Sequence, residues 1–173
     1  MVKRLFTPLK PYDIEQLKIG DQVELYGTIY TGRDAVLPKI VRLINEGRVD
    51  SLGADLNGAV IFHSAVSVAG IGPTTSNKVE IESSIPTLSA AGVKMHLGKG
   101  ALSPETVRAL AHHGSVYAVT APVTALLTSK VISRRLVAFG NEGMEAFFEL
   151  KVEGFPAIIA AAHGKSVSIR GEG

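Results

Sequence analysis

The chain has 173 residues, no cysteine and a formal net charge of only +2 at pH 7, and 46% of its residues are hydrophobic. This composition predicts one globular domain over residues 1–173 and excludes disulfides, a cysteine nucleophile and a thiolate-bound metal on this chain. Basic residues form no stripe with interleaved aromatics, and the longest apolar run, at 155–162, is too short to cross a bilayer. We therefore expect a cytoplasmic protein without a nucleic-acid or membrane partner.

The first half of the chain is predicted to alternate between helices and strands. After an approach segment at 1–20 that contains a short helix, spacing and alternation indicate a strand at 22–30, a helix from about Pro38 to Gly47 and a strand at 59–63. The next helical region contains Pro86. Because proline lacks the N–H that a helix interior needs, we expect Pro86 to divide this region into two helices.

The second half is predicted to end in a strand-rich third. Ser103 and Pro104 are typical of a helix start, as a hydroxyl N-cap followed by proline at the first position. Further elements are expected as strands at 93–98 and 115–120, a short helix at 123–127, and strands at 135–139, 146–152, 157–162 and 166–169. Together these elements predict a mixed α/β fold in which helices pack over a central sheet.

Three short polar stretches share one design. Residues 31–34, 72–78 and 98–100 each follow an apolar strand-like run, contain glycine and supply one cation, namely Arg33, Lys78 or Lys99. Ligands of open α/β sheets bind where loops converge at the carboxyl ends of strands, and such cations suit a small dicarboxylate. The start of a helix near Lys78 would also favour an anion, although Thr75 or Ser76 could be a simple N-cap with Lys78 solvated.

Six motifs in order resemble a known family. They are GTIYTGRDA at 27–35, GAVIFHS at 58–64, GPTT at 72–75, GKG at 98–100, GMEA at 143–146 and VEGFPA at 152–157. This set resembles the β subunit of class I iron–sulfur fumarate hydratases, and it is similar to the β subunit of L-tartrate dehydratases. The resemblance covers about residues 5–168. It implies a swivelling β/β/α domain, with a mixed sheet packed by helices.

The resemblance also implies roles for individual residues. Arg33 would hold a substrate carboxylate, and Thr74 or Thr75 would transfer the proton at the substrate carbon. Lys78 stands where the family has arginine, so it keeps the charge of a substrate-binding residue but loses the two-pronged geometry. Lys99 would be the third substrate-binding cation.

The implied activity is a hydro-lyase of the tricarboxylic acid cycle that reversibly hydrates fumarate to malate. The resemblance also implies that a partner α subunit holds a [4Fe–4S] cluster, in a dimer of heterodimers, and the absence of cysteine from this chain fits that division. Two alternatives stay open. One is an L-tartrate or other hydroxy-dicarboxylate dehydratase with the same partner, and the other is a non-catalytic anion-binding domain on the same scaffold.

The five histidines have no metal-binding spacing. His63 closes a predicted strand and His96 lies within another, so both are expected to be buried, satisfied groups rather than metal ligands. His112 and His113 end a predicted helix, where positive charge is favourable. We therefore expect no metal site on this chain.

Overall fold

A mixed sheet and a row of helices make up the fold. The computed structural model describes residues 1–67, 70–71, 78–120 and 124–167. Its helices are α1 (Pro11–Glu15), α2 (Leu37–Asn45), α3 (Lys78–Ala90), α4 (Pro104–His112) and α5 (Thr124–Ser129), with short 3-10 helices η1 (Val49–Leu52) and η2 (Gly140–Glu145). Its strands are β1 (Val2–Phe6), β2 (Gln22–Thr31), β3 (Val60–Phe62), β4 (Val66–Ser67), β5 (Gly70–Ile71), β6 (Met95–Gly98), β7 (Val116–Val119), β8 (Val131–Ala138), β9 (Phe147–Ala162) and β10 (Lys165–Ser166). The predicted mixed α/β class is confirmed.

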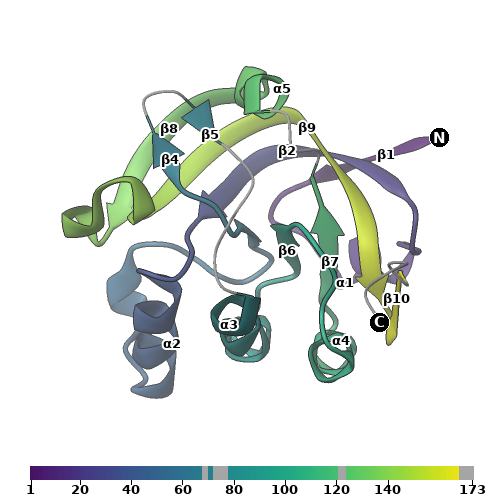
Figure 1. Ribbon diagram of the computed structural model, residues 1–173, viewed down its shortest axis with the longest axis horizontal. Coiled ribbons are helices and arrows are strands. Elements are labelled where there is room, and N and C mark those ends of the chain that lie inside the picture. Colours follow the sequence, from purple (N-terminus) through teal and green to yellow (C-terminus); the bar gives the residue numbers. More distant parts are fainter. Residues whose placement is uncertain (68–69, 72–77, 121–123, 168–173) are drawn as a thin grey trace.

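The main sheet closes on itself through its longest strand. Strands β1, β2, β3, β6 and β7 are parallel neighbours in that order. Strand β9 runs antiparallel to them and pairs with both β7 and β2, while β8 and β10 pair with β9. In Figure 1, β2, β8 and β9 arch over one side of the molecule, and α2, α3 and α4 lie in a row along the other.

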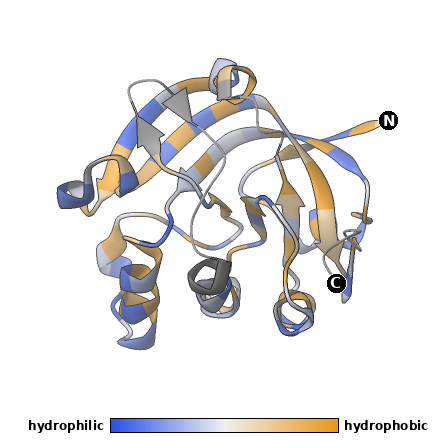
Figure 2. Cartoon of the chain, in the orientation of Figure 1, coloured by the Kyte–Doolittle hydropathy of each residue, from blue (hydrophilic) through white to orange (hydrophobic). Residues whose placement is uncertain are grey.

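Alternation along the strands divides the buried side chains between two faces. Leu25, Phe62, Leu97 and others of the same register form the largest buried cluster, enclosed by the curved sheet. The next residues along β3 and β6 face the helices, where Ile61 packs in a second cluster with side chains of α2 and α3. Figure 2 shows the corresponding alternation of hydrophobic and hydrophilic residues along β8 and β9.

Helix α3 runs unbroken from Lys78 to Ala90 with Pro86 inside it, so the prediction of two helices was wrong. Proline at this position removes one backbone hydrogen bond and costs about 3 kcal/mol in an isolated helix. The helix persists because Ile85 and Leu88, on either side of Pro86, are fully buried. Tertiary packing therefore outweighs the local preference.

Other local predictions had mixed outcomes. The helix start at Ser103 is confirmed, because its side chain accepts a hydrogen bond from the N–H of Thr106. The approach segment was wrong in part, since its first residues form β1, which pairs with β2. The two strands expected at 146–152 and 157–162 are one strand, β9, of 16 residues.

Candidate functional site

The carboxyl ends of β2, β3, β6 and β7 lie side by side. The backbone N–H groups of Gly32, His63 and Thr120, each just past the end of its strand, donate hydrogen bonds to carbonyl groups of a neighbouring strand. Arg33 follows Gly32, and Lys99 follows the last residue of β6. We call this region, residues 31–34, 63–64, 98–100 and 120, the carboxyl edge. In open α/β sheets such an edge is where ligands bind.

Arg33 is held in place by an acidic residue distant in sequence. Its Nη2 lies 3.1 Å from Oε2 of Glu145, and the two side chains are only 22% and 32% exposed. The turn before it needs glycine, because a Cβ on Gly32 would lie 2.9 Å from a methyl group of Val36. The ion pair with Glu145 uses one of the five N–H donors of the guanidinium, so Arg33 keeps donors for a second carboxylate.

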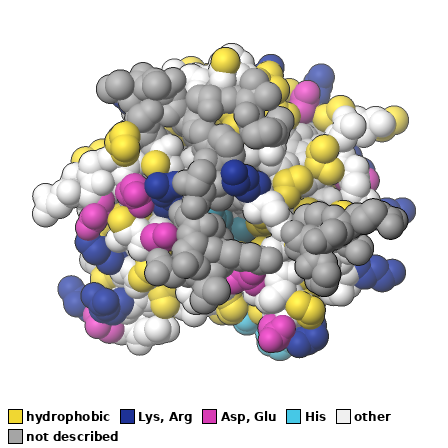
Figure 3. Space-filling view, viewed as in Figure 1, with side chains coloured by type: hydrophobic (Ala, Val, Ile, Leu, Met, Phe, Trp, Pro, Cys, Tyr) yellow, Lys and Arg dark blue, Asp and Glu magenta, His cyan; other side chains and the backbone are white. Residues whose placement is uncertain are grey.

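A second ion pair fixes η2 against α2. The ammonium of Lys39 contacts the carboxylate of Glu142 and lies 5.4 Å from the ring centroid of Phe139. Glu142 and Glu145 both belong to η2. In Figure 3, Lys and Arg side chains lie near the middle of the viewed face, with acidic side chains beside them on the left. The two pairs therefore tie η2 to the segment that carries Arg33.

Lys99 is exposed on a loop whose shape is fixed from below. The hydroxyl of Tyr117 donates to the carbonyl of Gly100 at 3.1 Å, and a Cβ on Gly98 would lie 3.1 Å from that hydroxyl. Gly100 has a φ of +85°, a conformation that favours glycine. Burial raises the pKa of Tyr117, so its hydroxyl stays a neutral donor.

Glu82 connects α3 to the helix that follows the Lys99 loop. Its Oε1 accepts hydrogen bonds from the backbone N–H and the hydroxyl of Ser103, at 3.0 and 2.7 Å, and from the hydroxyl of Thr106 at 2.6 Å. A carboxylate at the N-terminus of α4 also interacts favourably with the helix dipole. Residues 98–103 are thus held at both ends.

Two buried histidines and a serine form a hydrogen-bonded chain. Nε2 of His63 lies 3.1 Å from Nδ1 of His96, and Nε2 of His96 lies 3.0 Å from Oγ of Ser89. Burial lowers the pKa of His63 to about 4. Burial, together with the neighbouring His63, holds the pKa of His96 well below its usual range. Both rings are therefore neutral at physiological pH.

Buried polar atoms without partners gather at the carboxyl edge. Among the described residues, four buried side-chain atoms make no hydrogen bond: Oγ1 of Thr31, Oδ1 of Asp34, Nδ1 of His63 and Oγ1 of Thr120. Each of these residues ends or follows β2, β3 or β7. An unpaired buried polar group costs about 1–3 kcal/mol, and such groups in native proteins call for an explanation. Their common position indicates a site for a polar ligand.

A family model for the C-terminus of fumarases matches residues 4–170. The chain belongs to this fumarase C-terminus family. The match covers the main sheet except for the first two residues of β1, and it confirms the resemblance drawn from the six motifs.

Proteins similar to this chain are named either for tartrate dehydratase or for fumarate hydratase. A protein of Escherichia coli K12 named L(+)-tartrate dehydratase subunit beta is 28% identical, over 96% of this chain and 87% of its own length. A Methanocaldococcus jannaschii protein, provisionally given the same name, is 34% identical over 94% and 89%. A Geobacillus stearothermophilus protein, provisionally named fumarate hydratase class I, is 31% identical over 94% of this chain but only 33% of its own length.

The structure describes some of the predicted site residues and not others. Arg33 and Lys99 both lie in loops of the carboxyl edge, and their roles in substrate binding stay predictions. Thr74 and Thr75 lie outside the described residues. Lys78 is the first residue of α3, and its side chain also lies outside the described part. Because α3 connects the parallel strands β3 and β6, its N-terminus is directed toward the carboxyl edge.

Sequence reasoning missed Glu145 as the partner of Arg33, and it missed the pairing of His63 with His96. Glu145 lies 112 positions from Arg33, and His63 lies 33 positions from His96, so no local spacing could indicate either pair. The only available signal for Glu145 was an acidic residue inside the GMEA motif. Within the described part of the chain, no three His, Asp or Glu residues are placed to hold a metal ion, and no helix has the length and apolar character to cross a membrane.

Proposed function

We propose that this chain is the β subunit of a hydro-lyase that reversibly hydrates fumarate to malate. One observation carries the proposal: a set of buried, unpartnered polar atoms lies at the same sheet edge as Arg33 and Lys99. Cations attract a dicarboxylate, and the neutral members of this set, at Thr31, His63 and Thr120, would orient it, whereas the carboxylate of Asp34 would not. Membership of the fumarase C-terminus family supports the reaction class.

Arg33 binds one carboxylate of the substrate. Its guanidinium is already oriented by Glu145, so little conformational freedom is lost when the substrate arrives. The remaining N–H donors form charge-assisted hydrogen bonds with the carboxylate. Lys99, on the loop fixed by Tyr117, contributes a second positive charge at the same edge.

Hydration adds a hydroxyl to one carbon of the double bond and a proton to the other. We assign the proton transfer to Thr74 or Thr75 and a carboxylate contact to Lys78. A threonine hydroxyl is a weak base, and neighbouring cations favour its ionised form. In the reverse direction the ionised threonine removes the proton from carbon, the C–O electron pair leaves with the hydroxyl, and the proton held by the threonine passes to that hydroxide to give water.

A second subunit completes the enzyme. This chain has no cysteine, so its residues do not fit an iron–sulfur cluster, and we assign the [4Fe–4S] cluster to a partner α subunit in a dimer of heterodimers. When bound, such a cluster supplies Lewis-acid polarisation of the substrate's hydroxyl. The G. stearothermophilus relative supports this division, because two thirds of that protein have no counterpart in this chain.

L-tartrate dehydration is the second candidate reaction. The E. coli and M. jannaschii relatives named for tartrate dehydratase are matched over 87% and 89% of their length, whereas the fumarate hydratase relative is matched over 33%. Both reactions eliminate water from a hydroxy-dicarboxylate, so the cations of this edge suit either substrate. The choice between the two substrates would depend on residues of the partner subunit and on the neutral polar groups of the carboxyl edge.

The test is co-expression with the α subunit under anaerobic conditions, followed by assays with fumarate, L-malate, L-tartrate and methylated malate. Turnover of fumarate and L-malate supports the first proposal, and turnover of tartrate alone supports the second. Absence of turnover with all four, in a complex with an intact cluster, would leave a non-catalytic anion-binding domain. We expect the isolated chain to be colourless and inactive, and hydratase activity from the metal-free chain would contradict the two-subunit assignment.

A further inference from the structure

The hydrogen bonds that link Ser89, His96 and His63 form a path that leads toward the carboxyl edge. Ser89 is the next-to-last residue of α3, His96 is the second residue of β6, and His63 follows the end of β3. Strands β3 and β6 are parallel, with Ile61 opposite His96, so His63 lies two residues further toward the carboxyl edge. The hydrogen bonds therefore lead from the C-terminal end of α3 to the ring of His63.

The ring atom that ends this hydrogen-bonded path is Nδ1 of His63. It has no hydrogen-bond partner in the described part of the protein, although His63 is fully buried. Thr31 on the adjacent strand and Thr120 at the end of β7 likewise have buried, unpaired hydroxyl groups. By strand alternation these two hydroxyl groups lie on the other face of the sheet from His63, which faces α3. A buried ring nitrogen that ends a hydrogen-bonded path without a partner calls for an explanation of its own, and a bound ligand supplies one.

The pairing restricts where the ring protons lie. Each neutral imidazole carries one N–H, so the contact between His63 and His96 needs one donor and one acceptor. If His96 donates through Nδ1, then Nε2 of His63 is the acceptor and Nδ1 of His63 carries a proton. In that arrangement Ser89 donates to Nε2 of His96, and all three donors point toward the carboxyl edge. In the opposite arrangement Nδ1 of His63 is a bare acceptor.

We propose that Nδ1 of His63 is a ligand-binding N–H donor at the carboxyl edge, and that His96 and Ser89 are positioning residues that fix this tautomer. The proposal rests on the proposed function only for the identity of the ligand, a small dicarboxylate. Its reason is electrostatic complementarity. A carboxylate oxygen only accepts hydrogen bonds, so it is stabilised by an N–H and repelled by a bare nitrogen lone pair.

The tautomer can be measured directly on the full chain. Long-range ¹H–¹⁵N NMR spectra of the protein labelled at histidine distinguish a protonated ring nitrogen from a bare one. We expect His63 protonated at Nδ1 and bare at Nε2, and Ser89→Ala should populate the other tautomer. Protonation of wild-type His63 at Nε2 would overturn the proposal whatever the enzyme does.

Two amide variants separate the roles of the two ring nitrogens. The amide of asparagine lies near the position of Nδ1, whereas that of glutamine lies near Nε2. In the reconstituted complex we expect His63→Gln to weaken L-malate binding about ten- to hundredfold, measured by calorimetry, because a hydrogen bond to a charged group is lost. His63→Asn keeps a donor toward the ligand and should retain most of the affinity.

A double-variant comparison tests the positioning role of Ser89. Ser89→Ala should weaken L-malate binding a few-fold in the wild-type background and have no further effect beside His63→Asn, since it acts through the tautomer of His63. Thermal melts identify any variant that fails to fold, and the NMR result still decides the tautomer. Unchanged affinity in folded His63→Gln would overturn the ligand contact. If the wild-type complex binds none of fumarate, L-malate and L-tartrate, the proposed function fails, and the NMR spectra still decide whether His63 is a donor.

Discussion

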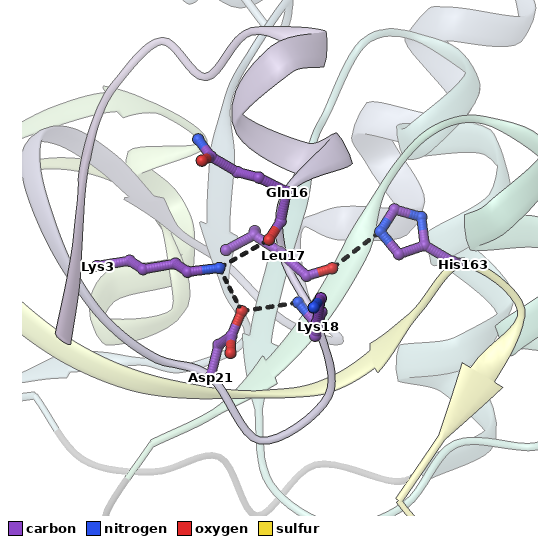
Figure 4. A network of polar contacts seen from close by, with 6 residues as sticks. All are labelled: Lys3, Gln16, Leu17, Lys18, Asp21 and His163. Atoms are coloured by element: carbon purple, nitrogen blue, oxygen red, sulfur yellow. Dashed lines mark hydrogen bonds and ion pairs between the residues drawn. The ribbon is translucent and has the colours of Figure 1, made fainter. Parts of the chain in front are cut away.

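Polar groups at the two ends of the parallel strands are used in opposite ways. At the amino ends of β1 and β2, Nζ of Lys3 contacts Oδ2 of Asp21 at 2.8 Å, and the same oxygen accepts from a backbone N–H. Figure 4 shows this network, which joins the side chains and backbone groups of Lys3, Gln16, Leu17, Lys18, Asp21 and His163. Each contact joins two groups of this chain, so the network contributes to stability without a ligand.

At the carboxyl edge, by contrast, several buried polar atoms have no hydrogen-bond partner among the described residues. Thr31, His63 and Thr120 are less exposed than the side chains of Lys3 and Asp21, yet each has an unpaired polar atom. Burial without pairing costs stability, and such departures from local optimality cluster at functional sites. The difference indicates that the amino-end network maintains the fold and that the carboxyl edge binds a ligand.

The largest expected effect is on Arg33. In the reconstituted enzyme, Arg33→Ala should lower kcat/KM. The expected loss of transition-state stabilisation is about 3 kcal/mol or more, since a buried substrate carboxylate would lose its charged partner. Arg48→Ala is a matched control, because the side chain of Arg48 is mostly exposed and its ion pair with Glu46 lies on the surface. A decrease of less than about tenfold, or about 1.4 kcal/mol, would remove Arg33 from the site and weaken the comparison.

The buried histidines should make stability depend on pH. Both keep neutral rings when folded, because their pKa values are lowered, whereas in the unfolded chain each titrates near 6.5. Their contribution is complete above pH 6.5 and is lost as the pH falls below it, toward about 4 for His63. Between pH 6 and 5 the free energy of unfolding should fall by roughly 1.2 kcal/mol for His63, and His96 adds a fall in the same direction.

Urea denaturation at pH 6 and pH 5 measures this change. His63→Asn should make the fall in the free energy of unfolding smaller by about 1.2 kcal/mol, because only one of the two buried imidazoles remains. Equal slopes in the variant and the wild-type protein would mean that His63 takes up a proton without leaving its buried position, and the distinction between the two ends would lose that support.

Much of the fold was predictable because its signals are local. Ser103 and Pro104 specify a helix start within two residues, and apolar alternation specifies β2. The division of β9 into two strands was wrong because Gly154 and Pro156 look like interruptions. The structure instead has a register shift in which Gly154, with a φ of +71°, is the extra residue opposite the step between Leu25 and Tyr26.

The candidate site was less predictable because its contacts are long-range. Arg33 and Lys99 could be predicted, since each lies in a glycine-containing loop after a strand. The pairs Arg33–Glu145 and His63–His96 could not, because they depend on which strands become neighbours. The unpaired atoms are harder still to predict, since a sequence does not show which buried groups stay without hydrogen-bond partners.

A smaller effect is expected at Tyr117. Tyr117→Phe removes the hydrogen bond to Gly100 that fixes the Lys99 loop, which should lower kcat/KM a few-fold and stability by about 1 kcal/mol. The control is Tyr26→Phe, which removes a comparable 3.1 Å hydrogen bond to Glu24 on β2. The comparison predicts that only the Tyr117 variant changes kinetics, and equal kinetic losses in both variants would contradict it.

The smallest effect should come from the amino-end network, and it should be purely structural. Lys3→Met should lower the free energy of unfolding by about 0.5–1 kcal/mol near neutral pH, because the Lys3–Asp21 pair is partly exposed. The hydrogen bond from Lys3, followed by the N–H of Lys18, lowers the pKa of Asp21 below its ordinary 3.8. The stabilisation is therefore present above pH 3.8 and is lost as the pH falls further. Denaturation of both proteins at pH 7 and pH 3 tests this, and kcat/KM in the complex should not change. A kinetic defect as large as that of the Tyr117 variant would show that the two ends of the sheet are not functionally separate.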